Sequence, residues 1–404
     1  MIKKYKNVSV IGLGYIGLPT AALLASKGYL VNGMDVNREA VETINRGEIH
    51  IVEPDLAAYV RSAVANGKLK ASMEVQPADV YIICVPTPFH TDSEIPTPNL
   101  DYIRVAAENI APHIKDDDIL ILESTSPVGT TDMVREILKK NGVHSSKAYI
   151  AYCPERVLPG RIMSELVDNA RVIGGIDSIS TKVVASFYRT FVSGEILETD
   201  AKTAEMCKLT ENSFRDVNIA FANELSIICD KNDVNVWDLI ELANHHPRVN
   251  VLQPGTGVGG HCIAVDPWFI VSDDPKNSRL IKTARNVNDE KPEWVVNKIK
   301  AVADSQKTKK IACLGLAFKP DIDDLRESPA IRVVESLTQQ GYEVFCVEPN
   351  ITDHPKYNLV DIKVALNEFD VIALLVSHKE FISKVVIREL AGKGVLDFCG
   401  AMSK

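Results

Sequence analysis

The fold is decided by a stretch near the start of the chain, Val8-Ser9-Val10-Ile11-Gly12-Leu13-Gly14-Tyr15-Ile16-Gly17. Its first four residues, apolar apart from Ser9, predict a buried strand. The glycines that follow form a G-x-G-x-x-G pattern, which permits a tight turn, a close approach of backbone to a pyrophosphate, and close packing of the next helix on the strand. The stretch therefore predicts the entrance to a dinucleotide-binding βαβ unit.

The residues after this stretch complete the unit and indicate its ligand. A helix over 18–26 and a strand over 31–35 are expected, so that Asp35 ends the second strand. A carboxylate there accepts hydrogen bonds from an adenosine ribose and repels a 2'-phosphate, which favours NAD over NADP. Arg38 keeps NADP open as an alternative, although an arginine beside adenine or in solvent is favoured. A glycine turn that holds no ligand is a minor alternative.

Strands and helices alternate through most of the chain, which predicts a parallel doubly wound sheet. A long helix without proline or glycine follows over 203–231 and could connect two domains. A second βαβ unit begins at Lys310, with Ser328 and Pro329 as a helix start. The further expected elements are strands 80–85, 119–122, 311–316, 343–347, 371–376 and 395–398, and helices 102–114, 131–140 and one after Asn37 that ends at Gly47. The predicted fold class is α/β, with two Rossmann-like domains joined by a long central helix.

Composition excludes several classes of protein. The chain has 404 residues and a formal net charge of -9, which argues against broad binding to nucleic acid or to acidic membranes. The start of the chain lacks an apolar signal core, and the longest apolar runs are too short to span a bilayer. Eight cysteines without a C-x-x-C pair predict neither a disulfide framework nor a metal site. A soluble protein in a reducing cytoplasm is expected.

A glycine-rich segment, Leu252-Gln253-Pro254-Gly255-Thr256-Gly257-Val258-Gly259-Gly260-His261-Cys262-Ile263-Ala264-Val265-Asp266-Pro267, is the most informative part of the chain. Its glycines let backbone approach a ligand closely. Taken alone, Cys262 is as consistent with packing as with nucleophilic catalysis. Beside a carboxylate and an NAD site, a thiolate could trap an aldehyde as a hemithioacetal that then loses a second hydride.

The chain resembles the UDP-glucose/GDP-mannose dehydrogenase family over nearly its whole length. The resemblance rests on separated motifs, namely residues 10–19, Val85-Pro86-Thr87-Pro88, Glu123-Ser124-Thr125, Cys153-Pro154-Glu155-Arg156, the helix segment 208–212, Gly259-Gly260-His261-Cys262 and Gly315-Leu316-Ala317-Phe318-Lys319. It implies three segments: an NAD-binding domain over 1–200, a central helical linker and dimerisation region with the cysteine loop over 201–300, and a UDP-sugar-binding domain over 301–404.

The resemblance also implies catalytic roles. Lys208 and Asn212, which share one helix face with Arg215, would lie beside the reacting sugar, where the lysine stabilises an oxyanion. Asp266 would partner that lysine and water. Glu155 and Thr125 would lie near the attacking water, with Glu155 as a base. The division of base duty among Lys208, Asp266 and Glu155 stays open. The alternative for the three helix residues is a solvated polar stripe. The alternative for Asp266 is a structural cap of its loop.

Two sets of binding residues are implied in the same way. The cofactor set is Gly12, Gly14, Tyr15, Ile16, Gly17, Asp35, Arg38, Thr87, Thr125 and Arg326. The substrate set is Arg156, Val157, Lys208, Asn212, Arg215, His246, Arg248, Gly259, Phe318 and Lys319. A surface basic loop is the alternative for Phe318, Lys319 and Arg326, but the carboxyl end of a strand is where α/β sheets bind ligands. His261 is interpreted as packing or as a substrate contact.

The implied reaction is the NAD-dependent four-electron oxidation of a nucleotide-sugar C6 hydroxymethyl through a cysteine thioester, as used in polysaccharide biosynthesis. Residues 48–54, 246–250 and 266–269 most resemble members that act on UDP-N-acetyl-D-mannosamine. UDP-N-acetylglucosamine and UDP-glucose are alternatives. A sensor that lost turnover is disfavoured by the retention of Cys262, Lys208, Asn212 and Asp266. A homodimer formed through the long helix is expected, with Arg248 reaching the neighbouring subunit.

Overall fold

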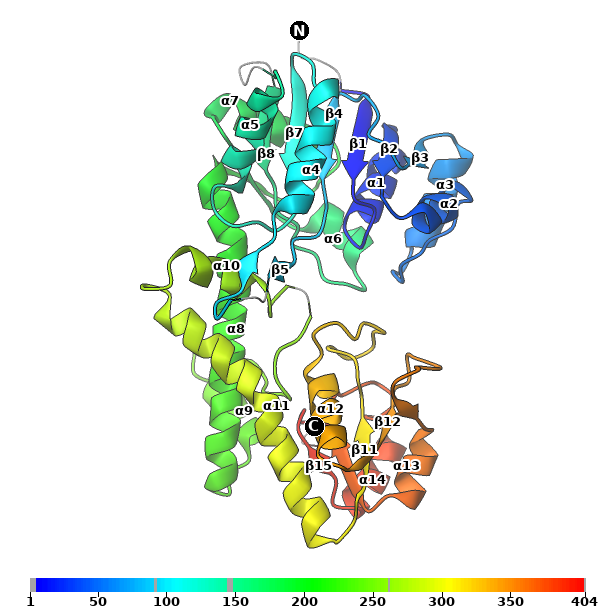
Figure 1. The fold of residues 1–404 in the computed structure, drawn as a ribbon, viewed down its shortest axis with the longest axis vertical. Helices are drawn as coiled ribbons and strands as arrows, with labels where there is room; N and C mark the ends of the chain where they lie inside the picture. The colour runs from blue at the N-terminus through cyan, green and yellow to red at the C-terminus, as the bar shows by residue number, and fades with distance from the viewer. Residues whose placement is uncertain (1–4, 91–92, 144–147, 261, 403–404) are drawn as a thin grey trace. The chain divides into compact units, whose positions relative to one another are not determined.

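The computed structural model describes residues 5–90, 93–143, 148–260 and 262–402. The chain divides into two compact units, Met1–Thr210 and Glu211–Lys404, and the long helix α8 (Ala201–Lys231) contains the boundary (Figure 1). The predicted helix over 203–231 is thus confirmed. The predicted three-part division at 200 and 300 stays a prediction. Within the described residues, no helix is both long and apolar enough to cross a membrane.

The first unit is built on an eight-stranded sheet in the order β10-β9-β8-β7-β4-β1-β2-β3. The strands are β1 (Asn7–Ile11), β2 (Leu30–Met34), β3 (Leu69–Ser72), β4 (Val80–Ile83), β7 (Asp118–Leu122), β8 (Ala148–Tyr152), β9 (Arg171–Gly175) and β10 (Ile196–Asp200). A small hairpin, β5 (Phe89–His90) with β6 (Thr97–Pro98), stands apart from it. Neighbouring strands of the large sheet are parallel except β8 and β9, which are antiparallel. The predicted parallel doubly wound sheet is thus found, except at that one pair, where the connection contains only the short α6 (Ile162–Asp168).

Helices cover both faces of this sheet (Figure 1). They are α1 (Gly17–Ser26), α2 (Arg38–Asn45), α3 (Leu56–Ala65), α4 (Asp101–Ile110), α5 (Thr130–Lys140), α6 and α7 (Ser178–Tyr188). Central strand β4 is buried along its length, and its side chains alternate between two cores. Val80 and Ile82 pack with α1, whereas Tyr81 and Ile83 pack with α4 and α5. A strand buried on both faces explains the continuous apolar run in the sequence.

The second unit joins a group of helices to a smaller sheet. The helices are the remainder of α8, α9 (Val236–Asn244), α10 (Asp266–Asp273) and α11 (Arg279–Ser305). The parallel sheet has the order β13-β12-β11-β14-β15, with β11 (Lys310–Leu314), β12 (Glu343–Val347), β13 (Asn358–Leu359), β14 (Val371–Leu374) and β15 (Leu396–Asp397). Helices α12 (Pro329–Gln339), α13 (Ile362–Glu368) and α14 (Lys384–Gly392) complete it. The α/β class with Rossmann-like parallel sheets is confirmed.

Ser328 differs from its prediction. It precedes α12, and Pro329 starts the helix as expected, but the serine hydroxyl makes no capping hydrogen bond. It donates instead to the carbonyl of Leu316 at 2.6 Å, in the loop that follows β11. The serine therefore anchors the loop after β11 to the start of α12. By contrast, Asn37 caps α2 through the backbone N–H groups of Glu39 and Ala40, as predicted.

A buried ion pair joins α8 to α11 inside the second unit. Arg285 donates to the Asp216 carboxylate at 2.6 Å, and both side chains are fully buried. Asn288 donates to the same carboxylate at 2.8 Å. Burial raises the pKa of Asp216 to about 6, although Arg285 opposes the shift. Asp216, Arg285 and Asn288 therefore tie α8 to α11, although Asp216 Oδ2 and Arg285 Nε have no hydrogen-bond partner in the described part of the chain.

Candidate functional site

The predicted glycine turn follows β1 in the structure. Gly12 has a φ of 91°, and a Cβ there would lie 2.6 Å from the carbonyl oxygen of Cys84. A Cβ on Gly17 would lie 1.7 Å from the carbonyl oxygen of Gly12. A Cβ on Gly14 would meet none of the described atoms within 4 Å. Two of the glycines are thus required by the turn and the helix contact, whereas the third leaves its backbone open to a ligand.

Asp35 fixes this turn from the end of β2. Its Oδ2 accepts a hydrogen bond from the Leu13 N–H at 2.8 Å, and its Oδ1 accepts one from the Asn37 N–H at 2.8 Å. A carboxylate has about four lone-pair sites, so acceptor capacity remains for ribose hydroxyls. Among the described residues, no side chain caps the start of α1, and its N–H groups suit a pyrophosphate. These residues fit NAD, which when bound accepts hydride from the substrate.

The remaining predicted cofactor residues of this unit lie around the same edge of the sheet. Thr87, after β4, donates to the carbonyl of Thr125, after β7, at 2.7 Å. The structure therefore ties these two loops together at the carboxyl ends of neighbouring parallel strands. Tyr15 and Ile16 are half-buried between the glycines, and Arg38 is exposed at the start of α2. An exposed Arg38 agrees with the interpretations in which it is solvated or lies beside adenine.

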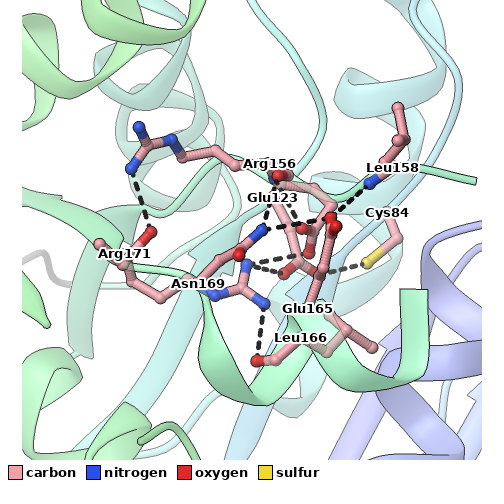
Figure 2. A network of polar contacts seen from close by, with 10 residues as sticks. Cys84, Glu123, Arg156, Leu158, Glu165, Leu166, Asn169 and Arg171 are labelled. Carbon is pink, nitrogen blue, oxygen red and sulfur yellow. Dashed lines mark hydrogen bonds and ion pairs between the residues drawn. The ribbon is translucent and has the colours of Figure 1, made fainter. Parts of the chain in front are cut away.

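A buried acidic network lies behind the loop after β8 (Figure 2). The Oε2 of Glu155 accepts a hydrogen bond from Arg171 at 2.9 Å, and its Oε1 accepts one from the Arg156 N–H at 2.6 Å. Arg171 also lies 3.7 Å from Glu123, whose other oxygen accepts a hydrogen bond from the Cys84 thiol at 3.0 Å. The ion pair with the buried Arg171 and the hydrogen bond from the Arg156 N–H therefore fix the orientation of the Glu155 carboxylate.

Arg171 and Glu123 were not predicted as site residues. Arg171 opens strand β9 with 1% of its surface exposed, and Glu123 ends the run of β7 with 3% exposed. Burial raises the pKa of Glu123 to about 7, the charge of Glu155 adds to the rise, and Arg171 opposes it. The signal in the sequence was an arginine directly before the apolar run of β9, a position that ordinarily requires a buried partner.

Arg156 and Val157 follow Glu155 in this loop. The Arg156 guanidinium donates to the carbonyl of Ala170 at 3.0 Å, as Figure 2 shows for the arginine side chain. Its own carbonyl accepts a hydrogen bond from Asn169 at 3.1 Å. Val157 is half-buried against the core of the first unit. The loop is therefore well fixed, and its predicted contacts with substrate remain a proposal.

Lys208 lies on the part of α8 that belongs to the first unit, where it is half-buried. One turn earlier, the fully buried Glu205 caps helix α5. Its carboxylate accepts hydrogen bonds from the Gly129 N–H at 2.6 Å and from the Thr131 N–H at 2.7 Å. Sequence reasoning missed Glu205, although its spacing of three residues from Lys208 places both on neighbouring turns. These hydrogen bonds fix the position of this part of α8, and so of Lys208, against the start of α5.

In the second unit, three predicted catalytic residues come together. Asn212 donates to the Asp266 carboxylate at 2.5 Å, and both side chains are buried. Asp266 begins α10, and its N–H donates to the carbonyl of Cys262 at 2.8 Å. The Cys262 side chain is half-buried. Arg215, on α8, is exposed. The backbone of the predicted nucleophile is thus bonded to that of Asp266, whose buried carboxylate accepts the Asn212 amide.

The glycine-rich loop packs on the loop after β11. A Cβ on Gly259 would lie 2.5 Å from the carbonyl oxygen of Glu327 and 2.9 Å from Cβ of Phe318. Gly260 has a φ of 82°, and a Cβ there would lie 2.8 Å from the Phe318 ring. These glycines are therefore required for packing against Phe318. His261 lies outside the described residues. Asn223 accepts a hydrogen bond from the Gly255 N–H at 2.9 Å and holds the start of the loop on α8.

The other predicted residues of this unit lie on exposed or half-buried loops. Lys319 is half-buried beside Phe318. The Arg326 guanidinium donates to both oxygens of Asp324, at 2.9 and 2.6 Å, and its carbonyl accepts the Gly260 N–H at 3.3 Å. His246 and Arg248 are exposed after α9, where the His246 ring accepts the Arg248 N–H at 3.4 Å.

The eight cysteines form no disulfide in the described part of the chain. Those interpreted as packing residues are buried at 153, 229, 313 and 346, and half-buried at 84, 207 and 399. Within the described ranges, no group of three or more His, Cys, Asp or Glu side chains is arranged to hold a metal ion.

The glycine turn after β1, with Asp35 and the start of α1, has the features of an NAD-binding site. Together with the Cys262, Asp266 and Asn212 side chains of the second unit, it indicates a dehydrogenase that uses NAD. The chain belongs to the UDP-glucose/GDP-mannose dehydrogenase family: its NAD binding domain matches residues 6–192, its central domain 202–290, and its UDP binding domain 312–404. The chain is accordingly an enzyme, a nucleotide-sugar dehydrogenase that binds NAD and has a UDP binding domain.

Individual relatives agree with this assignment. The chain is 52% identical to a UDP-N-acetyl-D-mannosamine dehydrogenase from Campylobacter jejuni, over 98% of this chain and all of the relative. It is 51% identical to an NDP-N-acetyl-D-galactosaminuronic acid dehydrogenase from Ralstonia nicotianae, over 99% of this chain and 97% of the relative. A solved UDP-D-ManNAc dehydrogenase from Pyrococcus horikoshii has a TM-score of 0.90 at 37% identity, covering 98% of this chain and 96% of that one.

Proposed function

We propose that the chain oxidises the C6 hydroxymethyl of UDP-N-acetyl-D-mannosamine to the carboxylate of UDP-N-acetyl-D-mannosaminuronate, with two NAD consumed per sugar. The observation that supports this most is the buried hydrogen bond from Asn212 to Asp266, four residues from Cys262, because acyl transfer through a thiol needs polar groups of this kind near the nucleophile. The names of the mannosamine-specific relatives support the choice of sugar. A cysteine is needed because the second oxidation requires a tetrahedral carbon that bears a heteroatom.

The proposed reaction has two oxidations and one hydrolysis. In the first oxidation the alcohol loses a hydride and a proton and becomes an aldehyde. The Cys262 thiolate then adds to the aldehyde carbon, and Lys208 with Asn212 stabilises the oxyanion of the thiohemiacetal. Loss of a second hydride gives a thioester. Water adds to its carbonyl, the thiolate leaves, and the carboxylate is released.

Lys208 and Asp266 exchange the protons of the alcohol and of the attacking water, because Asp266 lies beside the nucleophile loop. Glu155 holds the loop after β8 in position beside the reacting groups, since its carboxylate forms an ion pair with Arg171 and accepts the Arg156 N–H. Thr125 lines the nicotinamide end of the cofactor site through its tie to Thr87.

Sugar preference tests this proposal. With purified enzyme and excess NAD, kcat/KM for UDP-N-acetylmannosamine should exceed that for UDP-glucose by about tenfold or more, since the acetamido group adds contacts that a hydroxyl cannot make. UDP-N-acetylglucosamine and UDP-N-acetylgalactosamine belong in the same panel, the latter because of the Ralstonia relative. A higher kcat/KM on UDP-glucose would overturn the assignment of the sugar.

We further propose that the enzyme is a homodimer in which a second copy covers the exposed face of α8. Phe214, Phe221 and Ile228 recur every seven residues along this helix, and they are 66%, 53% and 50% exposed. Such a row of large apolar side chains on one helix face is typical of a helix that packs against a partner. The exposed Arg248 would then reach the site of the neighbouring subunit.

Complementation between subunits tests this arrangement. A Cys262→Ala chain supplies Arg248, and an Arg248→Ala chain supplies Cys262, so a mixed dimer should regain one complete site of its two. Activity after mixing and subunit exchange should rise well above that of either variant alone. Each variant exchanged with itself is the control. If differently tagged mixed dimers are isolated and show no recovered activity, Arg248 does not act on the neighbouring site.

A further inference from the structure

The corner that binds NAD in the first unit is repeated in the second. Gly12 has a φ of 91° and its N–H donates to the carbonyl of Met34 at 2.8 Å. Gly315 has a φ of 92° and its N–H donates to the carbonyl of Val347 at 2.8 Å. In both units the glycine follows the first strand of a parallel pair, and the acceptor ends the second strand. The two loops therefore start from the same hydrogen-bond frame.

The carboxylate that follows the second strand is also repeated, as glutamate in place of aspartate. Glu348 follows β12 as Asp35 follows β2, and its Oε2 accepts the Leu316 N–H at 2.7 Å. Its Oε1 accepts the Asn350 N–H at 3.1 Å, which matches the bond from Asn37 to Asp35. The residues that replace the second and third glycines of the first corner are Ala317 and Pro320. The second corner thus keeps the frame but loses the open glycine backbone.

The two carboxylates differ in what remains available to a ligand. Beyond the shared bonds, Glu348 accepts the Ala317 N–H at 3.0 Å, a ring nitrogen of His378 at 3.1 Å, and the Asn350 side-chain amide at 3.2 Å. Burial would raise the pKa of Glu348, but the hydrogen bond from His378 and those from backbone N–H groups outweigh burial and lower the pKa to about 2. With about four lone-pair sites per carboxylate, Glu348 is fully used inside the protein. It cannot accept a ribose as Asp35 can.

His378 is the residue that completes this change. It is fully buried, and its Nδ1 accepts the Asp321 N–H at 2.9 Å, so the ring proton lies on Nε2 and is donated to Glu348. Asp321 in turn accepts the Lys379 N–H at 2.9 Å. The imidazole therefore joins the end of β14 to both ends of the loop over 315–321. Its counterpart in the first unit is Thr87. The Cys84 N–H donates to the carbonyl of Ile11 as the Leu375 N–H donates to that of Leu314, and Thr87 and His378 each lie three residues after the donor.

We infer that His378 and Glu348 are positioning residues for the nucleotide half of the substrate. Glu348 aligns the N–H groups that open the loop, and His378 holds both that carboxylate and the far end of the loop, so that Phe318 and Lys319 between them keep one conformation. The same pair uses up the acceptor that corresponds to Asp35, so this loop does not hold an adenosine ribose in the way expected of the first unit. This inference rests on the proposed role of Phe318 and Lys319 in binding the UDP-sugar.

Binding of UDP, measured by calorimetry on the full-length enzyme, tests the inference. His378→Phe removes both ring hydrogen bonds and leaves buried partners unsatisfied, so Kd for UDP should rise by roughly tenfold or more. Kd for NAD should stay within about twofold, because the first corner is a separate frame. His378→Asn, whose oxygen can replace Nδ1 toward Asp321, should recover part of the affinity. His354→Phe is the matched control, since that half-buried ring stacks on Tyr357 and accepts a hydrogen bond from the Lys356 N–H near the protein surface.

The outcomes separate the inference from the function on which it rests. A His378→Phe enzyme that binds NAD normally and UDP as tightly as the wild type overturns the positioning role. If the fluorescence of the tryptophans of the second unit, at 237, 268 and 294, shows that His378→Phe has lost the fold of that unit, His378→Asn and His378→Gln decide. Each breaks one of the two bonds and should raise Kd for UDP by about threefold or more, and unchanged affinity in both overturns the role. Wild-type enzyme that binds no UDP contradicts the proposed substrate class itself.

Discussion

Replacing Cys262 with alanine is expected to lower the rate of uronic acid formation by about 10³-fold or more, because the second oxidation then has no covalent intermediate to act on. The first step does not need the thiol. A slow conversion of added UDP-sugar aldehyde to the alcohol, driven by NADH, should therefore survive. The measurement is the rate of each half-reaction, followed by NADH absorbance and by chromatography of the sugar products.

A second cysteine provides the control for this variant. Cys399 is also half-buried in the second unit, where its thiol lies 3.5 Å from Asp397. Cys399→Ala should keep nearly full activity. In the wild-type enzyme a thiol reagent should abolish turnover unless the UDP-sugar is present. An alanine variant at Cys262 that still forms the acid at a near-normal rate contradicts the thioester route.

Replacing Arg171 with methionine should destabilise the first unit by about 3–5 kcal/mol, because it leaves buried carboxylates without their cation. Arg171 is 1% exposed, with Glu155 at 2.9 Å and Glu123 at 3.7 Å. For a unit of this size the loss corresponds to a fall of roughly 6–20 °C in the unfolding midpoint. Arg189→Met is the control, since its ion pair with Glu198 is exposed and should contribute about 0–1 kcal/mol.

The chain offers an internal reference for this measurement. Its tryptophans, at 237, 268 and 294, all lie in the second unit. Tryptophan fluorescence should therefore report a nearly unchanged transition in Arg171→Met, while far-ultraviolet circular dichroism shows an earlier transition from the first unit. Equal shifts in Arg171→Met and Arg189→Met would show that the buried network contributes no special stability.

The same network predicts a pH dependence. The pKa of Glu123 is raised from its ordinary 4.5 to about 7, so the folded state binds a proton that the unfolded state has lost within that window. Stability of the first unit should fall as pH rises from about 4.5 to about 7. In Arg171→Met the fall should continue to higher pH, since the opposing positive charge is gone. A parallel pH profile in the two proteins would contradict this coupling.

Local patterns were enough to predict the main elements of the fold. The apolar run and glycines over 8–17 predicted β1 and α1, and Asn37 was recognised as a cap from its residue type alone. The strand over 343–347 has the same bounds as β12, in which Val344, Cys346 and Val347 are buried. The predicted strands over 311–316 and 371–376 end early, at Leu314 and Leu374, since the loops after them are also buried and apolar.

The roles of the predicted reacting groups stay predictions. Asn212 and Asp266 are hydrogen-bonded, and the Asp266 N–H donates to the carbonyl of Cys262. Arg171, Glu205 and His378 were missed, because their roles depend on partners tens of residues away and their own neighbours in sequence form no motif. The antiparallel pair of β8 and β9 was missed for the same reason, since strand direction depends on pairing and not on local composition.

The most direct test of the four-electron oxidation is the number of NADH formed per sugar. A limiting, known amount of UDP-N-acetylmannosamine is incubated with excess NAD and enzyme until absorbance is constant, and the sugar product is analysed by mass spectrometry. A four-electron oxidation predicts two NADH per sugar and UDP-N-acetylmannosaminuronate as the product. One NADH per sugar, with the free aldehyde accumulating, would contradict it.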